Sequence, residues 1–233
     1  MALGRTHSAQ GNRTSPVTTI GQLVEVTVET MNLVGQGFVT YADGLLLQEE
    51  IHAEVAPGHR ENTMILLEHE SVYTGGKMSE LSDVRDPSIE VVDTNRGGKI
   101  TWHGPGQLVG YPIYRLPNPI DVVGYVRTLE EMIIDVIGTY GVIGHRVEKR
   151  TGVWVGPEGA MQKIAAIGIR ISERTAMHGF ALNVNNSLDP FRAIIACGIA
   201  DAGATTLEVE GAAGITVAEV ASDIAQASRR FFS

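Results

Sequence analysis

The chain has 233 residues, of which 43% are hydrophobic and 19% are charged, and this is enough apolar material to bury a globular core. Its formal net charge of -9 argues against a nucleic-acid partner, because such partners are held largely by Lys and Arg. No apolar run approaches the about 18 residues of a membrane helix, and the polar start lacks the apolar stretch of a signal peptide. We therefore expect no membrane association and a reducing, cytoplasmic setting.

Elements in the first half of the chain follow from hydrophobic patterning. Residues 1–20 are rich in small and polar residues without a hydrophobic period, which predicts a disordered tail before a single domain over residues 21–233. Four segments are then expected: a half-buried strand over 23–28, a helix over 38–53, a buried strand over 64–67 and a loop over 74–90.

The second half shows clearer signals. A three- and four-residue apolar period predicts a helix over 122–140 between a capping Asp121 and Gly141, and a capping box at 216–219 begins a C-terminal helix. Strands are expected at 108–113 and 152–155, and a hairpin over 163–172 and 175–184. The fold class is therefore α+β, with a mixed β-sheet and packed helices.

A glycine-rich stretch over residues 96–107 is the densest functional signal. It holds four glycines, Arg96, Lys99 and His103 directly before a predicted strand. Glycines let the backbone approach a ligand closely, and their N–H groups can form an anion-binding concavity. The other interpretation is a long turn. The residue order matches neither a Walker loop nor a dinucleotide-binding loop.

Three isolated side chains allow both a structural and a chemical role. Cys197 is the only cysteine of the sequence, so it is either a buried apolar filler or a nucleophile. Lys163 heads an apolar strand, where it either reaches out to solvent or stabilises a nearby thiolate. His178 is either a structural residue of the hairpin or a catalyst.

Four segments in this order carry a family resemblance: 96–107, 163–168, 178–183 and 197–199. Together they resemble the octanoyltransferases, or lipoyl(octanoyl) transferases, of lipoate biosynthesis. Matching residues run from about 60 to 207. The resemblance implies a fold similar to the catalytic domain of biotin and lipoate protein ligases.

The resemblance also implies an activity and partners. Members transfer an octanoyl group from octanoyl-acyl carrier protein, through a cysteine thioester, to a specific lysine of lipoyl domains. This is the first step of endogenous protein lipoylation. The acceptors would be the lipoyl domains of 2-oxoacid dehydrogenases and the glycine cleavage H protein, and no cofactor or metal is implied.

Site residues follow from the matching positions. Cys197 would carry the acyl group and Lys163 would lower its pKa. The residues expected to bind substrate are Arg96, Gly97, Gly98, Lys99, Ile100, Thr101, Trp102, His103, Ala166, Ile167, Gly168, Gly179, Phe180 and Ala181. The chain departs from the family at Ala196 and Glu70, where prolines are usual, which puts local backbone rigidity in doubt.

Three other functions remain open from the sequence. They are an ATP-dependent lipoate or biotin ligase, a non-catalytic module that binds acyl groups, and a cysteine hydrolase using His103 or His178 as base. Acidic protein partners would also need a basic surface on this acidic chain. The expected patch, otherwise a solvated basic loop, is made of His145, Arg146, Lys149, Arg150, Arg96 and Lys99.

Overall fold

A seven-stranded mixed sheet forms the centre of the computed structural model, which describes residues 28–195 and 203–232. Its strand order is β1 (Val28–Asn32), β2 (Asn62–Leu67), β6 (Gln107–Ile113), β10 (Thr175–Asn183), β9 (Gln162–Ser172), β8 (Arg150–Val155) and β7 (His145–Val147). The β1–β2 pair is parallel, and the other neighbours are antiparallel.

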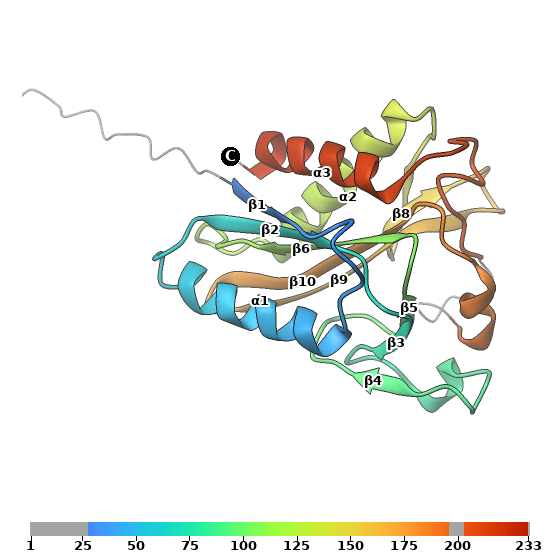
Figure 1. The fold of residues 1–233 in the computed structure, drawn as a ribbon, viewed down its shortest axis with the longest axis horizontal. Coiled ribbons are helices and arrows are strands. Elements are labelled where there is room, and N and C mark those ends of the chain that lie inside the picture. The colour runs from blue at the N-terminus through green and yellow to red at the C-terminus, as the bar shows by residue number, and fades with distance from the viewer. Residues whose placement is uncertain (1–27, 196–202, 233) are drawn as a thin grey trace, which may run out of the picture.

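Helices cover both faces of this sheet (Figure 1). Helix α1 (Tyr41–Val55) packs Ile51 and Val55 on one face, while α2 (Val122–Thr139) and α3 (Val217–Phe232) cover the other. Each buried Leu, Ile or Val side chain stabilises such a layer by about 1.5–3 kcal/mol. The predicted mixed sheet with packed helices is confirmed. No helix in the described part of the chain is long and apolar enough to cross a membrane.

Local signals place most of these elements correctly. Asp121 accepts a hydrogen bond from Gly124 N and caps α2. The N–H of Glu219 donates to Thr216 Oγ1 in the predicted capping box before α3. The hairpin of β9 and β10 turns at Glu173 and Arg174, whose φ values of 49° and 62° suit a tight two-residue hairpin turn.

A second sheet, ordered β4-β3-β5, was not predicted, and its strands β3 and β4 border the loop predicted over 74–90. Strands β3 (Val72–Gly75), β4 (Val91–Asp93) and β5 (Thr101–His103) are short, and a 3₁₀ turn, η1 (Leu81–Asp83), lies inside the predicted loop. These strands exist because β3 pairs with partners distant in sequence, which no local pattern reveals. Another 3₁₀ turn, η2 (Asp189–Ala193), follows β10.

Part of the N-terminal prediction lies outside the described residues. The tail over 1–20 and most of the strand predicted over 23–28 belong there, and the described part of that strand begins at Val28.

Candidate active site

A cavity of about 380 Å³ lies along β9 and β10 beneath the glycine-rich loop. Strand β8 pairs with β9 only as far as Ala165. Farther along β9, the glycine-rich loop pairs with the strand instead, because Gly97 N donates to Ile169 O at 2.9 Å. Most of the predicted substrate-binding residues line this cavity: Arg96, Gly97, Gly98, Lys99, Thr101, His103, Ala166, Ile167, Gly168, Gly179, Phe180 and Ala181. Their binding of substrate stays a prediction.

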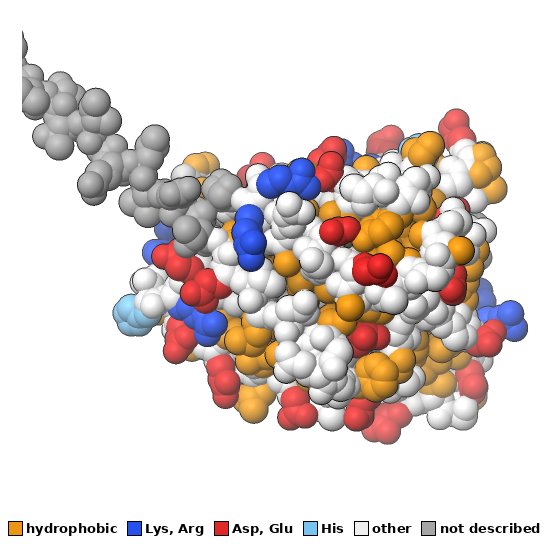
Figure 2. Space-filling model, turned by 45° about the horizontal axis from the view of Figure 1, so that its top comes forward, with side chains coloured by type: hydrophobic (Ala, Val, Ile, Leu, Met, Phe, Trp, Pro, Cys, Tyr) orange, Lys and Arg blue, Asp and Glu red, His pale blue; other side chains and the backbone are white. Residues whose placement is uncertain are grey.

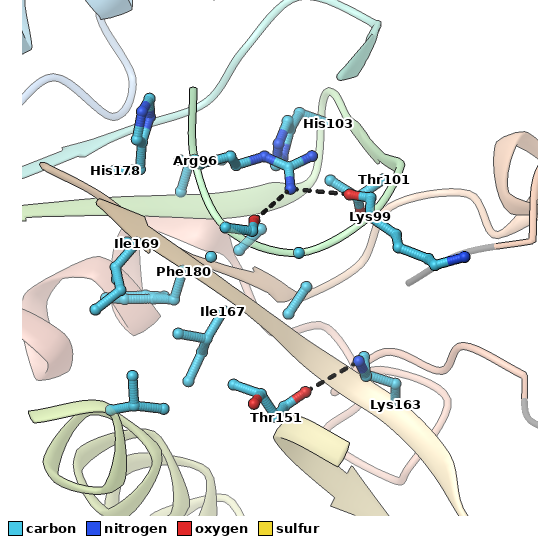
Figure 3. Close-up of a pocket in the computed structure, with 18 of the residues that line it drawn as sticks. Arg96, Lys99, Thr101, His103, Thr151, Lys163, Ile167, Ile169, His178 and Phe180 are labelled. Atoms are coloured by element: carbon cyan, nitrogen blue, oxygen red, sulfur yellow. Dashed lines mark hydrogen bonds between the residues drawn. The ribbon is translucent and has the colours of Figure 1, made fainter. Parts of the chain in front are cut away.

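Arg96 holds the loop in shape from within (Figure 3). The residue is only 7% exposed, and its guanidinium donates to Gly97 O, Lys99 O, Thr74 O and Thr74 Oγ1 at 2.7–3.1 Å. The rigid fork of donors in arginine suits several carbonyls at once. The expectation that Arg96 joins a basic docking surface is therefore wrong, because its charge is directed into the protein.

Two glycines outside the loop, Gly76 and Gly168, allow the backbone of the loop to lie directly against their own backbone. A Cβ on Gly76 would stand 2.3 Å from Gly98 O, and a Cβ on Gly168 would stand 2.8 Å from Gly97 O. Both distances are shorter than real side chains tolerate, so only glycine fits at these positions. The sequence thus encodes the position of the loop at two sites distant from the loop itself.

Ile100 and Trp102 are the two predicted substrate-binding residues that are not among those lining the cavity, and their binding of substrate also stays a prediction. Alternate residues of a strand point to opposite faces, so Thr101 and His103 face the cavity while their neighbours face away. Ile100 and Trp102 form a small core with Ile194. They support the cavity wall from behind.

Lys163 lies at the edge of the cavity near β8. Its Nζ donates to Thr151 O at 3.1 Å and stands 4.7 Å from the centre of the Trp154 ring. The backbone of Lys163 is hydrogen-bonded to the segment over 203–205, because Lys163 N donates to Gly203 O and Thr205 N donates to Lys163 O.

Cys197 and Ala196 fall in residues 196–202, which lie outside the described residues. The described residues that flank this segment, Ile195 and Gly203, make backbone hydrogen bonds near the cavity. Ile195 N donates to Asp83 O at 2.7 Å, and Asp83 in turn accepts a hydrogen bond from Lys99 Nζ at 3.1 Å. On the far side, Gly203 is bonded to Lys163.

The other departure from the family pattern, Glu70, is described. Glu70 is exposed, and its N–H donates to Val39 O at 3.1 Å. A proline at this position has no backbone N–H, so it could not donate this hydrogen bond to Val39 O.

Two histidines, His103 and His178, line the cavity, the His69 ring lies next to that of His103, and burial lowers the pKa of each. The pKa of His103 falls to about 3, chiefly through burial, with nearby His69 and Arg96 adding to the effect. Burial and then the Arg96 charge bring the pKa of His178 to about 4. His69 bridges Val39 O and the Tyr111 hydroxyl. All three rings are therefore neutral at pH 7.

His178 has an unusual backbone as well. Its φ is +56°, and its N–H donates to the buried side chain of Gln48 on α1 at 2.8 Å. Its ring contacts Asn95 Oδ1 at 2.7 Å. Backbone strain of this kind collects at functional sites because the surrounding structure must hold it in place.

Some lining residues were not among the predicted substrate-binding residues. Tyr41, Tyr111 and Thr151 reach the cavity from α1, β6 and β8, and only the three-dimensional fold brings them together. Further lining residues are Met78, Val109, Val126, Lys149, Arg150, Ile169 and His178. Alternation along β6 was the one available signal, because it places Val109 and Tyr111 on the same face. Within the described residues, no group of three or more His, Cys, Asp or Glu side chains is suited to hold a metal ion.

Solved structures of lipoate-protein ligases have an architecture similar to that of this chain. Among solved structures, a lipoate-protein ligase A bound with ATP superimposes with a TM-score of 0.69 at 15% identity, over 89% of this chain and 85% of that one. A putative lipoate protein ligase from T. acidophilum with bound lipoic acid gives a TM-score of 0.66 at 14% identity, over 89% and 86%. At these identities the likeness concerns the fold.

Sequence relatives are closer. An octanoyltransferase of Leifsonia xyli subsp. xyli is 54% identical over 72% of this chain and 76% of its own length. One from Salinispora tropica is 47% identical over 83% and 92%. Residues 40–229 also match the family described as the lipoyl protein ligase A/B catalytic domain. This chain therefore belongs to the lipoyl protein ligase A/B catalytic domain family and, within it, to the octanoyltransferases, which are acyltransferases.

Proposed function

We propose that this acyltransferase takes an octanoyl group from octanoyl-acyl carrier protein, holds it as a thioester on Cys197 and passes it to a lysine of a lipoyl domain. The acceptors are the lipoyl domains of 2-oxoacid dehydrogenases and the glycine cleavage H protein. The observation that carries the proposal is one cavity lined by Lys163 and the glycine-rich loop in a chain 54% identical to an octanoyltransferase.

Lys163 supplies the proton chemistry in this proposal. Lowering a cysteine pKa from 8.5 to about 7 needs roughly 2 kcal/mol of extra thiolate stabilisation, which a nearby ammonium group can provide. The thiolate attacks the donor thioester, the carbon–sulfur bond to the carrier arm breaks, and the departing thiolate takes a proton from Lys163. In the second half, an amine attacks the enzyme thioester, the enzyme sulfur leaves as thiolate, and Lys163 accepts the proton released by nitrogen.

Apolar side chains give the acyl chain a place to lie. Ile167, Ile169 and Phe180 line the cavity from the central sheet, and Val126 does so from α2. Each methylene that leaves water contributes up to about 0.8 kcal/mol, so an octanoyl chain gains several kcal/mol from such a surface. Backbone N–H groups of the loop and of residues 166–168 are the candidate donors to the oxyanion formed at each transfer.

The cations at the cavity edge suit acidic protein partners. Lys149 and Arg150 line the cavity, and the Lys149 side chain is 88% exposed. The face drawn in Figure 2 carries scattered acidic side chains and few cations, so it would repel an acidic carrier. Arg146, Lys99 and Lys149 each pair with a carboxylate, but the Lys149 side chain is far more exposed than those of Arg146 and Lys99. We therefore propose that the turn carrying Lys149 and Arg150 contributes most to carrier docking.

The rival functions have less support. An ATP-dependent ligase shares the fold, but at 15% identity against 54% for an octanoyltransferase. A cysteine hydrolase needs a histidine base, and the pKa values of about 3 and 4 at His103 and His178 are too low for that task at neutral pH. A reducing compartment, the cytoplasm, suits an enzyme whose nucleophile is a free thiol.

The test is an assay of acceptor octanoylation with octanoyl-acyl carrier protein as donor and no ATP. We expect turnover that Cys197→Ala and Lys163→Met each abolish. Acylation that requires ATP, uses free octanoate and survives Cys197→Ala would identify a ligase. Affinity for the acylated carrier without any turnover would identify a binding module.

A further inference from the structure

Glu130 is a fully buried carboxylate on α2 that bonds across to β8. Its Oε2 accepts a hydrogen bond from Arg127 Nη1 at 2.6 Å and stands 3.2 Å from Arg146 Nε. The other oxygen, Oε1, accepts a hydrogen bond from the backbone N–H of Gly152 at 3.0 Å. A buried charge is costly unless it is paired and hydrogen-bonded, so this carboxylate ties α2 to one peptide of β8.

That peptide joins Thr151 to Gly152, and its two polar ends have different partners. Because a trans peptide is planar, its C=O and N–H point in opposite directions. The carbonyl of Thr151 accepts a hydrogen bond from Lys163 Nζ at 3.1 Å (Figure 3). The N–H of Gly152 donates to Glu130 on the opposite side. One peptide therefore lies between the buried carboxylate and the ammonium group at the cavity edge.

Two features of β8 and β9 leave room for Lys163 in this position. Gly152 has a φ of +118°, and a Cβ there would lie 2.4 Å from Ala165 O and 3.4 Å from Lys163 Cε. The strand register also shifts here, because Val153 faces Ala165 while the next residue, Trp154, faces Lys163. Strand β9 thus contains one extra residue, and such a bulge re-aims the neighbouring side chain.

The Thr151 carbonyl can hold Lys163 in both of its protonation states. An ammonium group has three N–H donors and a neutral amine has two, and a carbonyl oxygen accepts from either. One hydrogen of Nζ therefore stays directed at Thr151, and the rest of the group is left for proton transfer. A carboxylate on the peptide N–H also makes the carbonyl a stronger acceptor, because hydrogen bonds in a chain polarise one another.

We propose that Glu130 is a positioning residue for Lys163: through the Thr151–Gly152 peptide, its carboxylate fixes the ammonium group at the cavity edge. This proposal rests on the proposed function, in which Lys163 gives a proton to the departing carrier thiolate and takes one from the attacking amine. Glu130 touches neither the substrates nor the reacting atoms, and it exchanges no proton in either step.

The variant Glu130→Gln tests this role, because an amide group has only one oxygen. Charged arginine donors bond more strongly than a backbone N–H, so the amide oxygen turns to Arg127 and the NH₂ group faces Gly152 N–H. The peptide must then move. We expect kcat for acceptor octanoylation to fall roughly 10- to 100-fold, with little change in KM for octanoyl-acyl carrier protein.

Arg127→Gln is the matched control. It breaks an ion pair to the same carboxylate but leaves the bond from Gly152 N to Glu130. Because the Arg127 side chain is 43% exposed, its ion pair adds little, and kcat should stay within about twofold of wild type.

Lysine NMR gives a measurement that needs no turnover. The lysines of the sequence are few: Lys77, Lys99, Lys149 and Lys163. A carbon-13 lysine label therefore gives few signals, and Lys163→Met identifies the one from Lys163. Its Nζ stands 4.7 Å from the centre of the Trp154 ring, so the ring current should shift its Hε signal upfield in wild type. Glu130→Gln should move this signal toward that of an exposed lysine, and Arg127→Gln should not.

Three results would overturn the proposal. The first is a loss of kcat in Arg127→Gln as large as in Glu130→Gln, which would show a role in stability alone. The second is a raised KM with unchanged kcat, which would show that Glu130 serves carrier docking. The third is a Lys163 signal that is the same in Glu130→Gln and wild type.

Wild type decides the matter if Glu130→Gln does not fold. The Gly152 N–H should be protected from hydrogen exchange and the Lys163 Hε signal should lie upfield, and the absence of either overturns the proposal. If wild type forms no thioester with octanoyl-acyl carrier protein, the proposed function fails. That failure is a separate result, because the NMR comparison still shows whether Glu130 positions Lys163.

Discussion

The Arg96–Lys99 loop and the turn carrying Lys149 and Arg150 both contribute cations to one cavity, yet their charges have different surroundings. Arg96 is 7% exposed and donates to four oxygen atoms of its own neighbourhood, while the Lys149 side chain is 88% exposed. A buried guanidinium acts as a scaffold, and an exposed ammonium is available to partners. Residue type alone does not distinguish these two uses of charge.

The largest expected effect is at Arg96. Arg96→Lys keeps the charge but loses the fork, so carbonyls that now accept charged hydrogen bonds become unsatisfied, each worth about 1.5–3 kcal/mol. We expect unfolding free energy to fall by roughly 2–4 kcal/mol in chemical denaturation, and acyl transfer to drop steeply. The reciprocal change Lys149→Arg should leave both unchanged. Equal tolerance at the two sites would remove the distinction between scaffold and surface.

Gly168→Val is the next effect in size. Its Cβ would lie 2.8 Å from Gly97 O, so the loop must leave β9 and lose the bond from Gly97 N to Ile169 O. We expect acyl transfer to fall about 10- to 100-fold, as displaced catalytic groups typically cause. Gly138→Ala on α2, with no atom within 4 Å of the added Cβ, is the control. A fully active Gly168→Val variant would show that the position of the loop does not matter.

The buried scaffold should also make stability depend on pH, which the exposed turn should not. Folding lowers the pKa of His178 to about 4 and that of His103 to about 3, so the unfolded chain binds protons first as the pH falls. The stabilisation is present above pH 6.5 and decreases below it, by about 2 kcal/mol per histidine at pH 5. Denaturation of wild type and His103→Gln at pH 7 and 5 checks this. An identical loss in both proteins would contradict the assignment for His103.

The smallest effect concerns the exposed turn. Lys149→Glu with Arg150→Glu should raise KM for octanoyl-acyl carrier protein by several-fold at low salt, and the difference should shrink at high salt because exposed charges are screened. Thermal stability should change little for the Lys149 substitution alone. A KM that is unaffected at low salt would exclude this turn from carrier docking.

Local signals explain what the sequence predicts well. The cap at Asp121, the box at Thr216 and the turn at Glu173–Arg174 each need only a few neighbouring residues, and the structure confirms all three. The small sheet was missed because Tyr73 pairs with Trp102 across almost thirty residues. Such pairs depend on tertiary contacts, which short windows of sequence do not contain.

The cavity residues also fall into those found from local sequence and those brought together only by tertiary contacts. Motif residues such as Lys163 and Gly168 were found because they lie in short contiguous segments that resemble the family, and they line one cavity. Tyr41 and Thr151 join it only through the packing of α1 and β8. Trp102 packs in a small core behind the cavity, because the position of a residue within a motif does not show which side of β5 it faces.

Intact-mass measurement after mixing the protein with octanoyl-acyl carrier protein tests the central claim most directly. The account predicts one added octanoyl group, removed by hydroxylamine and mapped to the peptide that contains Cys197, the only cysteine of the chain. Cys197→Ser should abolish the adduct or make it resistant to hydroxylamine. An octanoyl adduct that forms equally well in Cys197→Ala would contradict the account.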